Sequence, residues 1–449
     1  MPNAIRIRLF ACSARQGSVS RLVGSNLPIV KRQNRSAVLQ TLLRHGPVPR
    51  REVGHLTMLT PSTITNLVGE LIDQGLVREI PELASPPHVR VGRRPILLEI
   101  NANGGFVIGV FLGMTTLSVS IGDLRARVLG YRQTAMPSGI TEADLVALLV
   151  SEITTLLAEF ETPFDRVYGL GVIASGEVNS ESGMLLDLPG RPWRNVPIVA
   201  HLQSRLSLPV AIENSRRAMA LAELVFGEAK GVASMILIHL ATSIGCSLVI
   251  NERVYSGDHF GAGRLGHVVV EENGALCWCG KRGCLNTIAS TQGIVRVALA
   301  EAEAMPHSAL WGFHNGDVSL LTALDVLEAA DNGDLAAKQA IRKIATALGN
   351  AIANLVLILD PSMVVVTGQC VEDRDSLLVP LREIIDSIVE PATGRTANLQ
   401  LSAFGGTSTQ VASFTIALHR FVYSPALSLP NDAFANADDP RLSRVGIEV

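Results

Sequence analysis

The stretch GAGRLGHVVVEENGALCWCGKRGCLNTIAS, residues 261–290, constrains the rest of the chain more than any other. It combines one histidine with three of the six cysteines: His267, Cys277, Cys279 and Cys284. One imidazole and three thiolates are the donor set of a closed tetrahedral zinc site. Gly280 and Gly283 allow the sharp turn that would return Cys284 to an ion held by Cys279. We therefore predict one structural Zn²⁺ per chain; small core cysteines or a redox pair are the alternatives.

Length and cysteine usage limit the class of protein. A chain of 449 residues is too long for one core, so two or three domains are expected. The six cysteines are too few and too uneven for a disulfide framework, which indicates a reducing, cytoplasmic compartment. The longest apolar stretch, residues 235–250, is interrupted by polar residues, so we expect buried strands and no membrane span.

Charge is divided unevenly along the chain. The first 98 residues hold fourteen Lys/Arg against five Asp/Glu, a net +9, and because the whole chain is −3 the remainder carries −12. Neutralisation of phosphates dominates the affinity of proteins for nucleic acids. A basic N-terminal module on an acidic body therefore predicts a polyanion as partner of the module.

Both ends of the chain are expected to lie outside the folded domains. Residues 1–26 are basic and contain no acid, which suits a transit peptide, a disordered basic arm or an upstream start codon. We favour the last two, because the following module resembles a bacterial one. Residues 424–449 are rich in proline and aspartate and are predicted to be a loosely ordered tail.

Residues 27–101 have the pattern of a winged helix-turn-helix. Helices are expected over residues 30–44 and 50–56, and a third begins after Thr60 as N-cap and ends at Gly75. Polar residues on the outer side of its N-terminal half are predicted to contact DNA: Ser62, Thr63, Thr65 and Asn66. The alternative is that these side chains only cap the helix.

The predicted wing follows the third helix. Two β-prone runs flank a polar tip that contains Arg90, Arg93 and Arg94. Arginines beside a glycine can enter a minor groove or contact phosphates, so Arg93 and Arg94 are predicted to bind DNA. A solvated turn is the alternative.

Beyond residue 101 strand-like and helix-like segments alternate, which indicates α/β layers. Helices are expected over residues 144–160, 320–330 and 335–358, and strands within residues 105–124, 167–175, 234–250 and 362–368.

Residues 36–421 resemble the ROK family (repressors, open reading frames, kinases), in particular its repressor branch. The most specific match is LGH followed by C-W-C-G-K-R-G-C in the opening stretch. The resemblance implies a two-lobed, actin-like α/β body at residues 102–423 and a zinc site at the histidine and three cysteines. Lobe one would comprise residues 102–213 with 408–423, and lobe two residues 214–407. It also implies a homodimer or homotetramer that presents two recognition helices to a palindromic operator.

Several family motifs are altered in ways that argue against catalysis. The D-x-G-G-T phosphate loop of the kinases reads F-L-G-M-T from Phe111, and their G-T-G element reads A-T-S from Ala241. Their E-N-D-x-N run reads E-N-S-R-R from Glu213, so Ser215 occupies the position of the catalytic base. A serine is no base at neutral pH, and we expect no phosphoryl transfer and no enzyme activity.

The resemblance places the family's sugar site at altered residues too. Arg264 stands where E-x-G-H supplies a glutamate, and Asn286 replaces the glutamate after the last cysteine. Guanidinium groups favour carboxylate or phosphate. We therefore predict an anionic effector, a sugar phosphate or sugar acid, contacted by Asn214, Arg264 and Asn286 beside His267. The alternative is a pocket without ligand, in which Arg264 pairs with an internal acid.

The leading hypothesis is a repressor of carbohydrate-related genes that binds double-stranded operator DNA, acts in the bacterial cytoplasm on the nucleoid and has no membrane partner. A sugar kinase with an appended DNA-binding domain is one alternative. A constitutive DNA-binding protein whose body only oligomerises is another.

Overall fold

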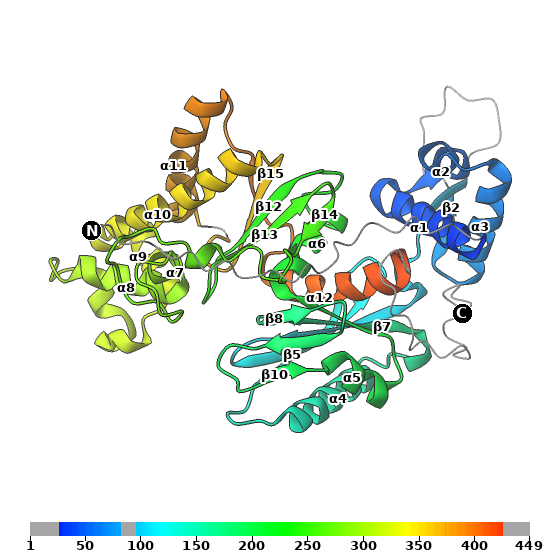
Figure 1. Ribbon diagram of the computed structural model, residues 1–449, viewed down its shortest axis with the longest axis horizontal. Helices are drawn as coiled ribbons and strands as arrows, with labels where there is room; N and C mark the ends of the chain where they lie inside the picture. The colour runs from blue at the N-terminus through cyan, green and yellow to red at the C-terminus, as the bar shows by residue number, and fades with distance from the viewer. Residues whose placement is uncertain (1–26, 82–95, 373, 425–449) are drawn as a thin grey trace, which may run out of the picture.

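The computed structural model describes residues 27–81, 96–372 and 374–424. Figure 1 shows a small helical head beside a body of two α/β lobes. The fold class predicted from the sequence is confirmed: the head has the winged helix arrangement and each lobe has its own mixed sheet.

Three helices and a small sheet form the head. The helices are α1 (Leu27–His45), α2 (Arg50–Thr57) and α3 (Pro61–Asp73), and the antiparallel strands are β1 (Val48–Pro49), β2 (Val77–Pro81) and β3 (Ile96–Ile100). Apolar side chains from all three helices and from β3 pack together, among them Val38, Leu39, Leu42, Val53, Ile64, Leu71 and Leu98. Gly75, at φ +74°, follows α3 as predicted, because this backbone conformation favours glycine.

Lobe one contains a five-stranded sheet in the order β11-β7-β4-β5-β6. Its strands are β4 (Phe106–Leu112), β5 (Thr116–Asp123), β6 (Val128–Ala135), β7 (Val167–Ala174) and β11 (Val210–Asn214). Helices α4 (Glu142–Glu159) and α5 (Ile198–Leu206) bury apolar side chains in its core. A second, antiparallel sheet is formed by β8 (Glu177–Asn179), β9 (Met184–Asp187) and β10 (Arg194–Val196).

Lobe two has a five-stranded sheet in the order β14-β13-β12-β15-β16. Its strands are β12 (Met235–His239), β13 (Gly245–Ile250), β14 (Arg253–Tyr255), β15 (Met363–Thr367) and β16 (Leu399–Leu401). Its helices are α7 (Asn286–Ala289), α8 (Thr291–Ala302), α9 (Ala323–Asp331), α10 (Leu335–Leu359) and α11 (Asp375–Thr393). Helix α9 begins three residues later than predicted, because Thr322 and Asp325 form a reciprocal capping box at its start.

Two helices join the lobes and the head. Helix α6 (Ser215–Val225) follows β11 directly, and α12 (Ser408–Leu418) returns from lobe two to pack on β4 and β7 of lobe one. In Figure 1 α12 runs across the middle of the molecule towards the head. A π-helical turn, His419–Tyr423, continues α12 and meets α1.

Within the described part of the chain, α10 alone is long and apolar enough to cross a membrane by length and composition. Half of its most apolar window is buried in the body. The apolar face of α10 packs against α8 and α11, so its composition is explained by the core of lobe two.

Candidate functional site

Helix α3 carries the residues predicted to read DNA. Thr60 caps it, since the N–H of Thr63 donates to Thr60 Oγ1 at 3.3 Å, and Pro61 occupies the first helical position. Its buried side consists of Ile64, Leu67, Val68 and Leu71. On the other side Ser62, Thr65 and Asn66 are exposed and Thr63 is half-buried.

The four polar side chains differ in what they can offer a ligand. The hydroxyls of Ser62 and Thr63 lie 3.1 and 2.9 Å from Thr60 Oγ1. Thr65 donates its hydroxyl to the carbonyl of Pro61 at 2.8 Å. The amide of Asn66 makes no hydrogen bond to any described residue, and a free amide can pair with two atoms of an adenine edge in the major groove.

The arginines near α3 differ in whether the structure describes them and in whether they form an ion pair. Arg90, Arg93 and Arg94 lie outside the described residues, although β2 and β3, which flank the predicted wing, pair as expected. Arg51 entered the sequence-based prediction only through its charge. In the described structure Arg51 is exposed in the first turn of α2 and has no ion-pair partner, whereas Arg50 binds Glu79 at 2.8 Å. The helix before a recognition helix crosses the phosphate backbone of DNA. The location of Arg51 on that helix is the sequence signal that could have predicted a phosphate contact.

The four predicted metal ligands come together. His267 ends a short 3₁₀ turn, Leu265–His267, and the cysteines lie on the loop that precedes α7. Their ligand atoms all lie within 4.8 Å of one another. Cys277 Sγ is 3.7 Å from His267 Nδ1, and Cys279 Sγ is 3.7 Å from Cys284 Sγ.

The backbone of this loop accounts for the geometry. Gly280 and Gly283 adopt φ of +86° and +69°, and a Cβ at Gly283 would stand 1.6 Å from the carbonyl oxygen of Glu271. The N–H of Cys277 donates to the carbonyl of Lys281 at 2.7 Å, which closes the turn that carries the first two cysteines. A glycine is therefore required at position 283 for Cys284 to reach the cluster.

The donor set fits a zinc ion. Sulfur atoms bound tetrahedrally at about 2.3 Å from zinc are about 3.8 Å apart, close to the 3.7 Å separation of Cys279 and Cys284. Burial raises the pKa of the Cys284 thiol, and the neighbouring thiols raise it further. A divalent cation would offset both effects, because it stabilises thiolates.

The asparagines predicted to contact an effector lie in different lobes, Asn214 at the turn between β11 and α6 and Asn286 at the start of α7. Asn214 caps α6 through Oδ1, which accepts from Arg216 N–H at 3.1 Å, and its amide donates to the Gly176 carbonyl at 2.7 Å. Asn286, from lobe two, accepts from Ile244 N–H at 2.7 Å and lies 3.5 Å from the hydroxyl of Ser243. Both asparagines are buried and use their amides within the protein.

Arg264 also has an internal partner. Its guanidinium binds Glu177 on β8 at 2.5 Å, and its side chain is exposed. This ion pair is the arrangement expected for a pocket without ligand. It joins a loop of lobe two to lobe one.

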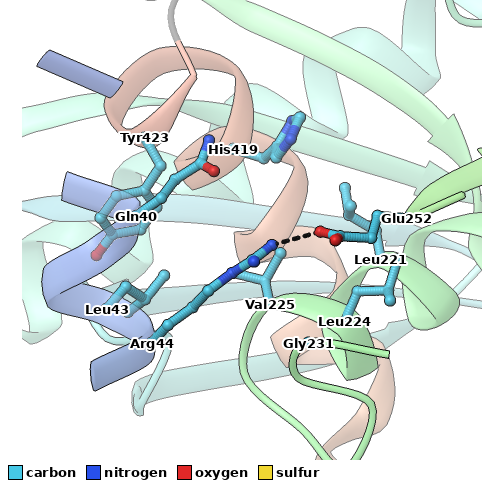
Figure 2. Close-up of a pocket in the computed structure, with 10 residues that line it drawn as sticks. All are labelled: Gln40, Leu43, Arg44, Leu221, Leu224, Val225, Gly231, Glu252, His419 and Tyr423. Carbon is cyan, nitrogen blue, oxygen red and sulfur yellow. Dashed lines mark hydrogen bonds and ion pairs between the residues drawn. The ribbon is translucent and has the colours of Figure 1, made fainter. Parts of the chain in front are cut away.

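A cavity of about 150 Å³ lies between the head and the body. Figure 2 shows Gln40, Leu43 and Arg44 of α1 facing body residues from α6, the π-helical turn and neighbouring loops: Leu221, Leu224, Val225, Gly231, Glu252, His419 and Tyr423. Arg44 binds Glu252 across it at 2.8 Å. Ser36 also donates to the carbonyl of Tyr423 at 2.6 Å, so polar contacts hold head and body together around a cavity lined by both polar and apolar side chains.

A model of the ROK family matches residues 107–418, which is more than half of the chain. The chain belongs to the ROK family. The family match covers both lobes and the cysteine cluster.

Known ROK proteins extend the likeness beyond the body. The xylose repressor of Caldicellulosiruptor bescii is 29% identical over 80% of this chain and 89% of its own length. A crystal structure of a ROK family transcriptional regulator, a homologue of the E. coli MLC protein, is 28% identical with a TM-score of 0.75, and covers 87% of this chain and 97% of its own. A ROK glucokinase from Streptomyces griseus, solved with glucose and AMPPNP, is 28% identical with a TM-score of 0.61, and covers 69% of this chain and 98% of its own.

The residues that differ from the ROK kinase motifs lie in regular secondary structure or at a turn. Ser215 is the first residue of α6 and is 4% exposed. Phe111 packs against the buried cluster that includes α12, and Met114 is exposed at the turn between β4 and β5.

Proposed function

We infer that this ROK protein is a repressor of carbohydrate-related genes that binds double-stranded operator DNA through its head and responds to an anionic, sugar-derived effector in its body. The observation that carries the proposal is the exposed N-terminal half of α3 on a head attached to a ROK body. Likeness to a xylose repressor supports carbohydrate-related targets.

The functional groups of the head's side chains suggest which part of the DNA each one contacts. Asn66 reads a base edge, Ser62, Thr63 and Thr65 contact phosphates or the groove wall, and Arg93 and Arg94 contact DNA from the wing. Homodimers or homotetramers would place two α3 helices on a palindromic site. Such a protein works in the cytoplasm, on the nucleoid.

The body acts without phosphoryl transfer. Ser215 lacks the basicity of the aspartate that its position carries in the kinases, and Phe111 lacks a carboxylate for metal and phosphates. One zinc ion per chain, held by His267 and the three cysteines, has a structural role because no coordination position is left open. Asn214, Arg264 and Asn286 lie around the effector.

To test this function, genomic DNA fragments that bind the purified protein are selected. The affinity of the protein for these fragments is then measured by fluorescence anisotropy. We expect Asn66→Ala to reduce discrimination between the selected site and random DNA by about 10- to 100-fold, since one bidentate base contact supplies about 1–3 kcal/mol. Equal losses on both DNAs would count against base reading by Asn66. An ATP-coupled assay with glucose tests the kinase alternative, and turnover would overturn the assignment.

A further inference from the structure

Arg216 projects from the first turn of α6 onto lobe two. At Gly245, the first residue of β13, an added Cβ would stand 2.1 Å from Arg216 Cδ and 2.5 Å from its Nε. The side chain therefore occupies the space that any larger residue at position 245 would fill. Arg216 spans from the helix that follows β11 to the sheet of the other lobe.

The charges around Arg216 do not balance. Arg217 binds Glu213 at 2.6 Å, and Arg264 binds Glu177 at 2.5 Å. In the structure as described, the guanidinium of Arg216 has neither a hydrogen bond nor an ion pair. Each carboxylate already has its own arginine, so one positive charge remains unpaired.

This charge is half-buried, and burial lowers the pKa of Arg216, opposed mainly by the charge of Glu177. A guanidinium partly removed from water without a partner carries a desolvation cost, and an anion is the partner that offsets this cost. The N-terminus of α6 adds a positive partial charge at the same place.

We propose that Arg216 is the principal anion-binding residue of the body and holds the phosphate or carboxylate group of a small sugar derivative. The inference rests on the proposed function, which it deepens by naming the residue that recognises the effector's charged group. The guanidinium can bind either group through two parallel hydrogen bonds. Arg264 has a secondary role, because it is exposed and already bound to Glu177.

Isothermal titration of the full-length protein tests this. The probes are D-glucose 6-phosphate, D-gluconate, inorganic phosphate and neutral D-glucose at equal ionic strength. We expect at least one anion to bind and Arg216→Gln to weaken that binding by about tenfold or more. Gly245→Ala should also weaken it, because the added methyl group displaces the arginine without removing its charge. Arg205→Gln, an exposed arginine on α5, is the matched control and should bind as the wild type does.

Three results would overturn the inference: no binding of any anion, binding of D-glucose alone, or equal anion affinity in wild type and Arg216→Gln. Gly245→Ala keeps the test decisive if Arg216→Gln does not fold. Operator binding is measured on the same samples. Operator binding without anion binding would overturn only this inference, whereas anion binding through Arg216 without operator binding would overturn the proposed function and support the site.

Discussion

We expect Arg51 to contact a DNA phosphate, unlike its neighbour Arg50. Arg50 is held by Glu79, whereas the Arg51 side chain is exposed and unpaired in the described part of the head. Arg51→Ala should weaken binding to operator and random DNA alike, and should make the plot of log affinity against log salt shallower by about 0.9 for each phosphate that is no longer neutralised. Anisotropy titrations at several salt concentrations measure both effects. Arg205→Ala, far along the chain on α5, should change neither; weaker binding to operator DNA alone would contradict phosphate binding by Arg51.

The cysteines make the metal prediction testable one residue at a time. Cys279→Ser should lower zinc content from one per chain towards none, because a hydroxyl is a poor replacement for a thiolate. Elemental analysis after dialysis gives the content. Cys370→Ala removes a buried cysteine outside the cluster and should retain the ion. One zinc per chain in both Cys277→Ser and Cys279→Ser would show that the ligand set is wrong.

Close packing of α12 on the sheet of lobe one depends on glycine. A Cβ at Gly171 would stand 2.0 Å from the carbonyl oxygen of Ser413, so Gly171→Ala must push α12 away from β7. Overpacking of this kind costs about 1–3 kcal/mol. The midpoint of urea unfolding should therefore fall. Gly312→Ala, where no atom lies within 4 Å of an added Cβ, should leave the midpoint nearly unchanged; equal midpoints in both variants would mean that α12 does not pack this closely.

Helix α6 connects the proposed ligand site with the head. Its first turn carries Arg216, and Leu221, Leu224 and Val225 line the cavity against α1. Glu252→Gln removes the ion pair with Arg44 at this junction. We expect ligand binding to persist while the effect of D-glucose 6-phosphate on operator affinity shrinks, since couplings between sites are typically about 1–3 kcal/mol. Titration and anisotropy on the same variant separate the two, and an undiminished response would exclude this ion pair from the coupling.

Acid should destabilise the molecule through two half-buried histidines. Burial lowers the pKa of His239 and of His419 from 6.5 to about 4 in each case. Below pH 6.5 the unfolded chain therefore binds more protons than the folded one, and the free energy of unfolding falls until about pH 4, by at most about 1.4 kcal/mol per pH unit for each histidine. Above pH 6.5 neither residue contributes.

Denaturant unfolding between pH 4 and 7 measures this slope. His419→Gln should flatten it relative to the wild type, and His259→Gln, an exposed histidine, should not. Identical slopes in all three proteins would show that His419 is protonated as readily in the folded chain as in the unfolded one.

Local chemistry in the sequence was enough to predict about half of the elements, among them α1–α4, α9 and α10. The N-cap at Thr60 and the glycine at position 75 mark the two ends of α3. The spacing of His267 and the cysteines predicted a cluster that the structure brings together. Each of these features involves only a short segment of the chain. Each also permits only a few backbone conformations or ligand geometries, so it can be recognised from the sequence.

The partners of the inter-lobe side chains could not be predicted in the same way. Glu177 and Arg264 are 87 positions apart, and Arg216 lies against Gly245 only because β13 meets the first turn of α6. The amides of Asn214 and Asn286 are likewise used by backbone groups distant in sequence. Motif spacing therefore predicted which residues would carry the chemistry. The packing of the two lobes and the head determined which charges are paired, because such pairing depends on how separate elements approach in space.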